Sequence, residues 1–306
     1  MLSTTLTGRC LPVFAALMAM TLIACGREAP EDTAADAEAG RVNVEAMAGQ
    51  NAEESTEPGG SATIDPERRV VSEQLPYADV EDELVYGHFA FPEDMLEPLP
   101  GIIVIHDWWG LNDNVRAMAD RLAGEGYIVL AVDLFGGKTA DNVQEARLLM
   151  LSVDKDAEAA RSNIGQAFEF LDMTAGAPRV GSLGWGFGGG WSLDAAMLLP
   201  RDLAAAAVYY GDDTDDMEKL DPVEAPILGL FGEADRGVPV DSVRRFEAAL
   251  QRLEKDHEIH IYPGAGHAFA NPTGRNYDPD LAEDAWRRTR DFLSQKLSDG
   301  SSDAEP

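Results

Sequence analysis

Residues 184–190 read Gly-Trp-Gly-Phe-Gly-Gly-Gly, between a strand-like apolar run at 179–183 and a helix-like run at 191–199. Glycines stand close on both sides of the position Gly186. A chain that folds back sharply from a strand into a helix needs glycine at such places, because a side chain would clash with the returning backbone. The stretch therefore predicts a tight strand-to-helix turn with residue 186 at its apex.

A turn of this form carries the nucleophile of the α/β-hydrolases, in the pattern Gly-x-nucleophile-x-Gly. The frame is complete here, but Gly186 stands where a serine or a cysteine would attack. Neither nearby serine is expected to replace it, because Ser182 lies inside the preceding strand and Ser192 lies in the second turn of the following helix. The sequence thus predicts a nucleophile elbow whose nucleophile position is vacant.

Strand and helix patterns alternate along the rest of the chain. Residues 101–105 and 127–132 are apolar runs typical of strands covered on both faces of a parallel sheet, and residues 84–91 are predicted to be the opening strand. Further strands are expected at 179–183, 203–210, 226–231 and 258–262, and helices after Asn112 or Asn114 and at 139–152, 156–174, 240–253 and 280–297. This order predicts an α/β protein with the α/β-hydrolase fold, a mostly parallel central sheet with helices on both faces.

Two polar residues follow late strands in the order that this fold requires. Asp235 comes shortly after the strand at 226–231, and His267 comes after the strand at 258–262. Such sheets bind ligands at the carboxyl ends of their strands. In acyl transfer the histidine takes a proton from the attacking group and returns it to the leaving group, while the aspartate orients the imidazole. Asp235 and His267 are therefore the predicted catalytic partners of the vacant position Gly186.

The loop after the strand at 101–105 is expected to border the same site. In this fold the loop supplies one backbone N–H of an oxyanion hole and the residue after the nucleophile supplies the other. Those residues are Trp108 and Phe187, and neither donor depends on its side chain. Other residues expected to line the pocket are Asp107, Trp109, Trp185 and Tyr210. Core packing is the alternative interpretation for the two tryptophans of the loop.

The N-terminal residues have the pattern of a secretory signal. Arg9 precedes an apolar run at 11–23, which ends at Ala24 and Cys25. The run is short for a membrane span, and its end resembles the lipobox of bacterial lipoproteins. We expect residues 1–24 to be a lipoprotein signal peptide and Cys25 to be lipidated, with an ordinary secreted protein or an uncleaved anchor as alternatives. The expected location is extracytoplasmic, the periplasm in a diderm bacterium, with membrane contact only through the lipid.

Residues 25–70 are rich in alanine, acidic residues, glycine and serine, and they contain few large apolar residues. Such a segment cannot bury enough apolar surface to order itself, so we expect an acidic disordered tether. The folded domain is predicted at 71–298, followed by a disordered tail at 299–306.

The 306 residues carry a formal net charge of −31 at pH 7. A polyanion repels nucleic acid and anionic membrane surfaces, so nucleic acid is not an expected partner. Both cysteines, Cys10 and Cys25, precede the predicted domain, which excludes a disulfide and a cysteine nucleophile within it. The five histidines form no zincin-type motif, and neither a metal nor a cofactor is expected. The sequence does not indicate the oligomeric state.

Residues from about 80 to 297 resemble the dienelactone hydrolase family. The resemblance is carried by the stretches at 105–112, 133–137, 184–191, 209–211, 232–239 and 264–271. It implies that a cysteine nucleophile, with aspartate and histidine partners, opens enol-lactones or similar small esters. The sequence departs from the family at Gly186, which replaces the cysteine, and at Asp107, which replaces a glutamate that contacts the thiol.

Three functions are compatible with these residues. The first is weak or water-mediated hydrolysis of small esters or lactones, with His267 activating water in the space that Gly186 leaves. The second is a catalytically inactive relative that binds a small carbonyl ligand or a protein partner in the former active-site pocket. The third is a thiol enzyme in which the glycine is an isolated change.

Overall fold

The computed structural model describes residues 65–298. The predicted signal peptide, the lipidation site Cys25, the tether up to residue 64 and the tail at 299–306 lie outside the described residues. Within the described part, no helix combines the length and the apolar character that crossing a membrane requires.

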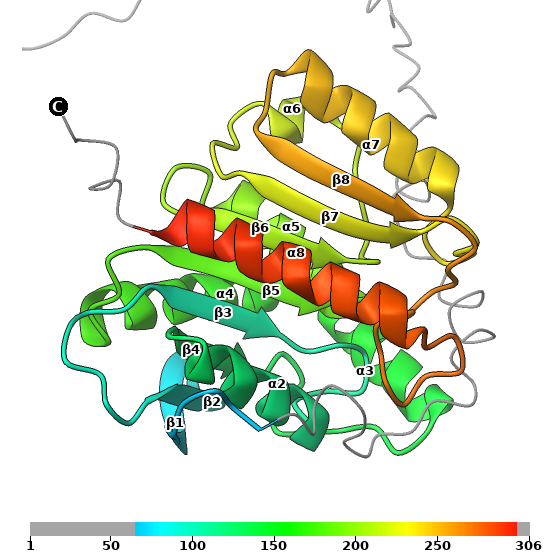
Figure 1. The fold of residues 1–306 in the computed structure, drawn as a ribbon. Helices are drawn as coiled ribbons and strands as arrows, with labels where there is room; N and C mark the ends of the chain where they lie inside the picture. Colours follow the sequence, from blue (N-terminus) through cyan, green and yellow to red (C-terminus); the bar gives the residue numbers. More distant parts are fainter. Residues whose placement is uncertain (1–64, 299–306) are drawn as a thin grey trace, which may run out of the picture. The chain divides into compact units, whose positions relative to one another are not determined.

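One eight-stranded sheet forms the centre of the described domain, with the strand order β1-β2-β4-β3-β5-β6-β7-β8 (Figure 1). Strands β3 to β8 run parallel, and β1 and β2 join antiparallel at one edge. The strands are β1 (Val70–Val80), β2 (Glu83–Pro92), β3 (Gly101–Ile105), β4 (Ile128–Val132), β5 (Val180–Trp185), β6 (Ala205–Tyr209), β7 (Ile227–Gly232) and β8 (His257–Tyr262). The mostly parallel sheet predicted from the apolar runs is confirmed.

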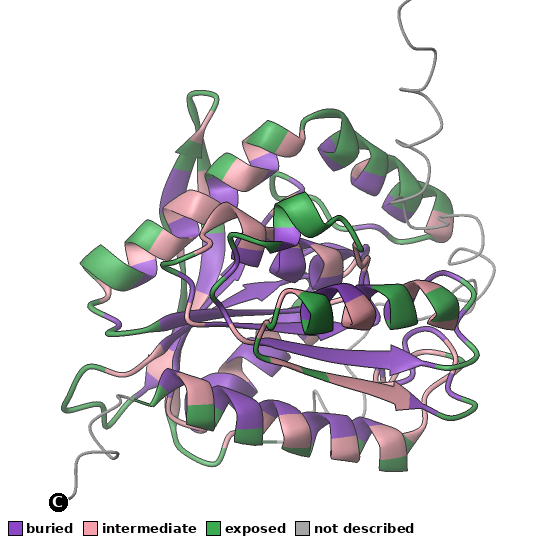
Figure 2. Cartoon of the chain, turned by 90° about the horizontal axis from the view of Figure 1, so that it is seen from above, coloured by how far each residue is buried: buried purple, intermediate pink, exposed green. Residues whose placement is uncertain are grey.

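Helices cover both faces of the sheet. The helices are α2 (Asp113–Gly124), α3 (Val143–Lys155), α4 (Ala157–Glu169), α5 (Phe187–Leu198), α6 (Met217–Leu220), α7 (Val240–Arg252) and α8 (Pro279–Leu297). Side chains of α2 and α8 pack with one set of strand residues, including Ile102 and Val104. Side chains of α3, α4, α5 and α7 pack with the alternate set, including Ile103 and Ile105. The central strands are therefore buried on both sides (Figure 2), which confirms the predicted α/β-hydrolase layering.

Two elements differ from the expectation. The opening strand is β1 rather than the strand predicted at 84–91, which is the second, β2. Most of β1 is exposed, so its residues lack the apolar alternation by which a strand is recognised. The single helix expected at 156–174 is α4 followed by one π-helical segment, Phe170–Thr174. Of the two candidate caps for α2, Asn112 is the one observed, since its side chain accepts the N–H of Val115.

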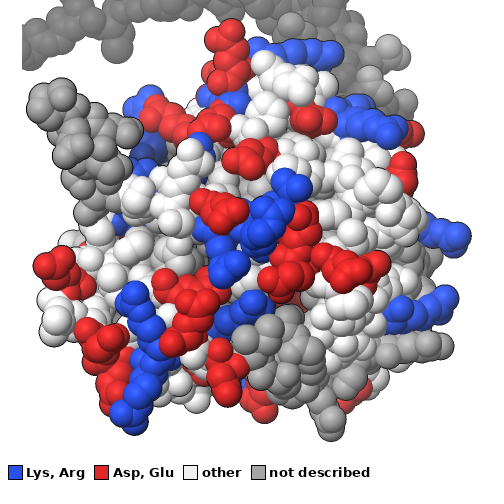
Figure 3. Space-filling model, in the orientation of Figure 1, with Lys and Arg blue, Asp and Glu red and all other residues white. Residues whose placement is uncertain are grey.

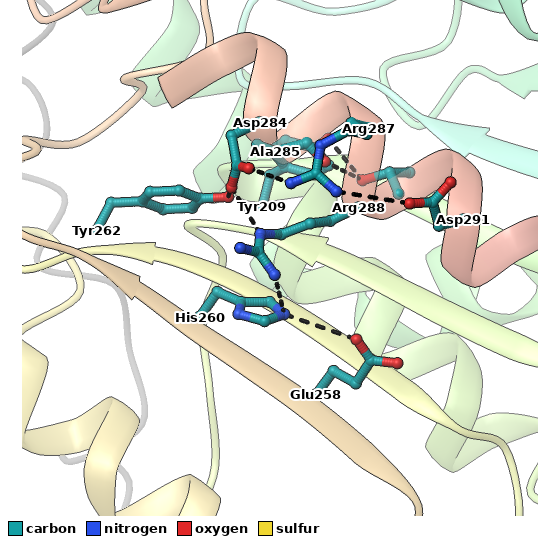
Figure 4. Close-up of polar contacts among 10 residues, drawn as sticks. Tyr209, Glu258, His260, Tyr262, Asp284, Ala285, Arg287, Arg288 and Asp291 are labelled. Atoms are coloured by element: carbon teal, nitrogen blue, oxygen red, sulfur yellow. Dashed lines mark hydrogen bonds and ion pairs between the residues drawn. The ribbon is translucent and has the colours of Figure 1, made fainter. Parts of the chain in front are cut away.

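Helix α8 is fixed to the sheet by polar contacts as well as by apolar packing (Figure 4). The Tyr262 hydroxyl, at the end of β8, donates to Asp284 Oδ2 at 3.0 Å, and Arg288 Nε donates to the same oxygen at 2.6 Å. From β6, the Tyr209 hydroxyl lies 2.7 Å from Thr289 Oγ1. Acidic and basic side chains interleave on the surface around this helix (Figure 3), where Arg287 pairs with Asp284.

Candidate active site

The strand-to-helix turn between β5 and α5 has the geometry predicted for an elbow. Gly186 has φ 53° and ψ −115°, a conformation that residues with a Cβ rarely adopt. Its N–H donates to the carbonyl oxygen of Tyr209 at 2.9 Å. A Cβ on Gly188 would lie 2.2 Å from the carbonyl oxygen of Ile105, which is closer than atoms can approach. Glycine at 188 therefore lets α5 pack against the end of β3.

His267 and Asp235 meet at the carboxyl ends of β8 and β7. His267 Nδ1 lies 2.8 Å from Asp235 Oδ2, and each side chain is 1% exposed. The other carboxylate oxygen, Oδ1, accepts the backbone N–H groups of Gly237 and Val238 at 2.7 and 3.0 Å. Three donors thus hold the carboxylate. Because Nδ1 faces a carboxylate, it carries the proton, and Nε2 is left as the nitrogen that can accept one.

One cavity connects His267 with the elbow. Gly186 and His267 both line it, and its volume is about 40 Å³. By the same measure a single water needs roughly 10–15 Å³, so the cavity holds a small number of water molecules. Other predicted site residues that line it are Asp107, Trp108, Trp185, Phe187 and Tyr210. The structure thus brings together residues from four separate loops.

The two predicted oxyanion donors lie at this cavity. Among the hydrogen bonds of residues 65–298, none uses the backbone N–H of Trp108 or of Phe187. The neighbouring loop amides are engaged, since Asp107 Oδ1 accepts the N–H of Trp109 at 2.9 Å and Asp107 O accepts that of Gly110 at 3.2 Å. Two unpaired amides beside a cavity are the elements from which an oxyanion hole is built.

Trp109 is the one predicted pocket residue that the structure does not bring to the cavity. Its side chain is 3% exposed and belongs to the core on the α3–α5 face. Its carbonyl oxygen accepts the N–H of Ala140 at 3.0 Å. Both the N–H and the carbonyl oxygen of Trp109 are therefore hydrogen-bonded, and its ring packs edge-on against Trp108. Core packing, the alternative interpretation, describes both rings, since Trp108 is 2% exposed in the same core, but Trp108 also lines the cavity.

Sequence reasoning missed two amide side chains that line the cavity, Asn114 and Asn271. Asn114 Oδ1 is buried and has no hydrogen-bond partner within the described residues, and the same is true of Trp108 Nε1. The sequence suggested Asn114 only as a candidate N-cap of α2. Because Asn112 is the N-cap, the Asn114 side chain is available to line the cavity. Asn271 closes the stretch at 264–271 that carries the family resemblance.

The remaining polar groups near the elbow are occupied inside the protein. Ser182 and Ser192 are fully buried, and their hydroxyl oxygens lie 2.8 Å apart. His106 Nδ1 donates to the carbonyl oxygen of Asp107 at 2.6 Å, and its Nε2 accepts the N–H of Leu134 at 3.1 Å. Burial lowers the pKa of His106, so the imidazole is neutral and both of its nitrogens are engaged.

Comparison with known proteins agrees with this architecture. The model of the dienelactone hydrolase family matches residues 85–297. The chain is 31% identical over 255 residues to a protein of Saccharolobus solfataricus named "Putative carboxymethylenebutenolidase", covering 71% of this chain and 96% of the relative. "Protein usf" of Aquifex pyrophilus is 32% identical over 208 residues, covering 65% of this chain and 89% of the relative.

Solved structures show the same fold. The crystal structure of a "Putative Dienelactone Hydrolase" from Klebsiella pneumoniae superposes with a TM-score of 0.67 at 26% sequence identity. The match covers 74% of this chain and the whole of that one. Since the family model spans the described domain almost from end to end, this chain belongs to the dienelactone hydrolase family of hydrolases.

Proposed function

We propose that this protein hydrolyses small esters or lactones by direct attack of a water molecule, without a covalent intermediate. The observation that carries the proposal is the buried, hydrogen-bonded His267–Asp235 pair, whose histidine lines the same cavity as Gly186. A site with an oriented base but no nucleophilic side chain can still activate water.

The chemical step uses groups of this chain only. His267 Nε2 accepts a proton from water as the water oxygen bonds to the carbonyl carbon of the substrate. The carbonyl oxygen becomes an oxyanion that the backbone N–H groups of Trp108 and Phe187 can hold. When the intermediate collapses, the bond to the alcohol oxygen breaks and the imidazolium returns its proton to that oxygen. The products are a carboxylic acid and an alcohol, or one hydroxy acid from a lactone.

We expect the rate to be low for this family. In hydrolases that have lost a catalytic triad residue, the oxyanion hole and substrate binding retain an acceleration of roughly 10³–10⁴ over water. The relative from Saccharolobus solfataricus is named "Putative carboxymethylenebutenolidase". A small enol-lactone of the class in that name is the substrate that we propose for this chain.

The proposal is tested by hydrolysis of p-nitrophenyl acetate with the full-length protein. The wild type is expected to exceed the His267→Ala variant about tenfold or more, because the base is then missing. His257→Ala is the matched control, since that half-buried histidine on β8 bonds to the Lys255 carbonyl oxygen and does not line the cavity. A wild-type rate equal to that of His267→Ala contradicts the proposal.

That contrary result would favour the second candidate, an inactive relative that binds a small carbonyl ligand or a protein partner. Its supporting observation is Gly186 itself, which removes the nucleophile on which the family's chemistry depends. Retained binding of a non-hydrolysable ketone by a wild type without activity would establish it.

We also propose that lipid on Cys25 holds the protein at an extracytoplasmic membrane surface. The support is the sequence pattern at 11–25. Labelled palmitate is expected to enter the wild type expressed in a diderm bacterium but not the Cys25→Ala variant, and equal labelling contradicts the proposal.

A further inference from the structure

A second cavity, of about 240 Å³, lies between α2 and α8. Three residues, Met118, Trp185 and Ala270, also line the cavity of Gly186 and His267, and the other lining residues belong to this cavity alone. Aromatic side chains form part of its wall, because Tyr209, Tyr277 and Trp286 line it as well as Trp185. By the measure used for the first cavity a single water needs roughly 10–15 Å³, so this cavity admits a small organic molecule.

A buried cation lines this cavity. Arg121, in the last turn of α2, is 8% exposed, and its guanidinium carbon lies 4.2 Å from the ring centroid of Trp286. Within residues 65–298 the guanidinium makes no hydrogen bond and no ion pair. The ring accepts no conventional hydrogen bond, so the five N–H donors of the guanidinium have no hydrogen-bond acceptor in the described domain.

Nearby carboxylates attract Arg121 without pairing with it. Burial lowers the pKa of Arg121, and the charges of Glu125 and Glu283 act in the opposite direction. Glu125 is already engaged, since its Oε1 accepts the indole N–H of Trp286 at 3.1 Å. Glu283 is an exposed residue of the cavity lining. No carboxylate oxygen of Glu125 or Glu283 lies within 4.0 Å of a guanidinium nitrogen of Arg121, which is the limit for an ion pair.

Other arginines of the domain show what a purely structural role looks like. Arg161 donates to both oxygens of Asp194, at 2.9 and 3.2 Å. Arg288 donates to Asp284 at 2.6 Å. Arg121 is more buried than either and lacks such a partner. A buried charge without a counter-ion is costly, and here the missing counter-ion coincides with an open volume.

We propose that the cavity between α2 and α8 is a binding site for a small organic monocarboxylate, with the carboxylate on the edge of Arg121 and an apolar body between Trp185 and Trp286. The fork of N–H donors matches a carboxylate in two-point contact. The aromatic walls favour a ligand with an apolar body, and Glu283 disfavours a second negative charge. The site uses neither His267 nor Asp235, so it does not rest on the proposed function.

The test is calorimetric titration of the full-length protein with benzoate, a planar monocarboxylate. The wild type is expected to bind one benzoate per chain at millimolar or lower concentration. Arg121→Met, which keeps an unbranched apolar stem but removes the guanidinium, is expected to weaken binding about tenfold or more. Arg116→Met is the matched control, because that residue lies on the same helix, pairs with Asp113 and does not line the cavity.

Two further measurements test the proposal if Arg121→Met does not fold, which its thermal transition would show. Arg121→Lys keeps the charge but loses the fork, so severalfold weaker binding is expected. Benzamide, a neutral ligand of the same shape, is expected to bind the wild type about tenfold more weakly than benzoate. Absence of saturable benzoate binding to the wild type, equal affinity of the Arg121 variants, or equal binding of benzamide would overturn the proposal.

Discussion

His267 Nδ1 and Asp235 Oδ2 lie 2.8 Å apart in a fully buried pair, although the residues are 32 positions apart in the chain. The contact exists because β7 and β8 are parallel neighbours, which places the loops after both strands at the same edge of the sheet. The aspartate is itself held by two backbone N–H groups. The pair is therefore rigid, and the imidazole keeps one tautomer.

Asp235→Asn should lower ester hydrolysis about tenfold or more, towards the level of His267→Ala, because an amide can donate to Nδ1 and so select the wrong tautomer. Initial rates with p-nitrophenyl acetate measure the effect. Glu233→Gln is the control, since this exposed residue of the same loop accepts only the N–H of Gly264. If Asp235→Asn keeps the wild-type rate, the pair does not orient a working base.

Gly186→Cys should raise the esterase rate well above that of the wild type, since it places a thiol beside His267 in the same cavity. It should also cost about 1–3 kcal/mol of stability, because φ is 53° at this position. Gly186→Ala supplies the control, with the same backbone cost and no nucleophile. A rate for the cysteine variant no higher than for the alanine variant would show that the rest of the site no longer supports covalent catalysis.

Ser182→Ala should leave the esterase rate unchanged while lowering the free energy of unfolding by about 1 kcal/mol. The Ser182 hydroxyl contacts only Ser192, at 2.8 Å from its hydroxyl oxygen and 3.2 Å from its carbonyl oxygen, so its loss leaves a buried polar group without a partner. Urea denaturation and initial rates measure the two effects. A large loss of activity at full folding would identify this serine as a substitute nucleophile.

Asp213→Asn should stabilise the protein at neutral pH. Burial raises the pKa of Asp213 to about 6, although Ser242 donates to its Oδ2 at 3.0 Å. Between about pH 4 and 6 the folded state therefore holds a proton that the unfolded state has lost, so wild-type stability falls as the pH rises through this window.

The asparagine removes that titration, and a gain of about 1–2 kcal/mol is expected at pH 7, shrinking towards zero near pH 4. Denaturation at a series of pH values measures it. Asp291→Asn is the control, because this exposed carboxylate pairs with Arg287 on the surface and does not act on the pKa of Asp213. A gain for Asp213→Asn that is the same at pH 4 and pH 7 would contradict the assignment.

The sequence by itself determined the elbow, the parallel sheet and the positions of Asp235 and His267 at strand ends. These features depend on local signals: glycines where the backbone must turn tightly, unbroken apolar runs in buried strands, and chain order. Only the tertiary structure decided which side chains share a cavity. It placed Trp109 in the core, brought Asn114 and Asn271 to the elbow, and set Arg121 against Trp286, because burial of a side chain depends on the packing of elements distant in the chain. It also revealed β1, an exposed strand at the edge of the sheet. The residue pattern of β1 does not predict a strand, and its hydrogen bonds to β2 define it.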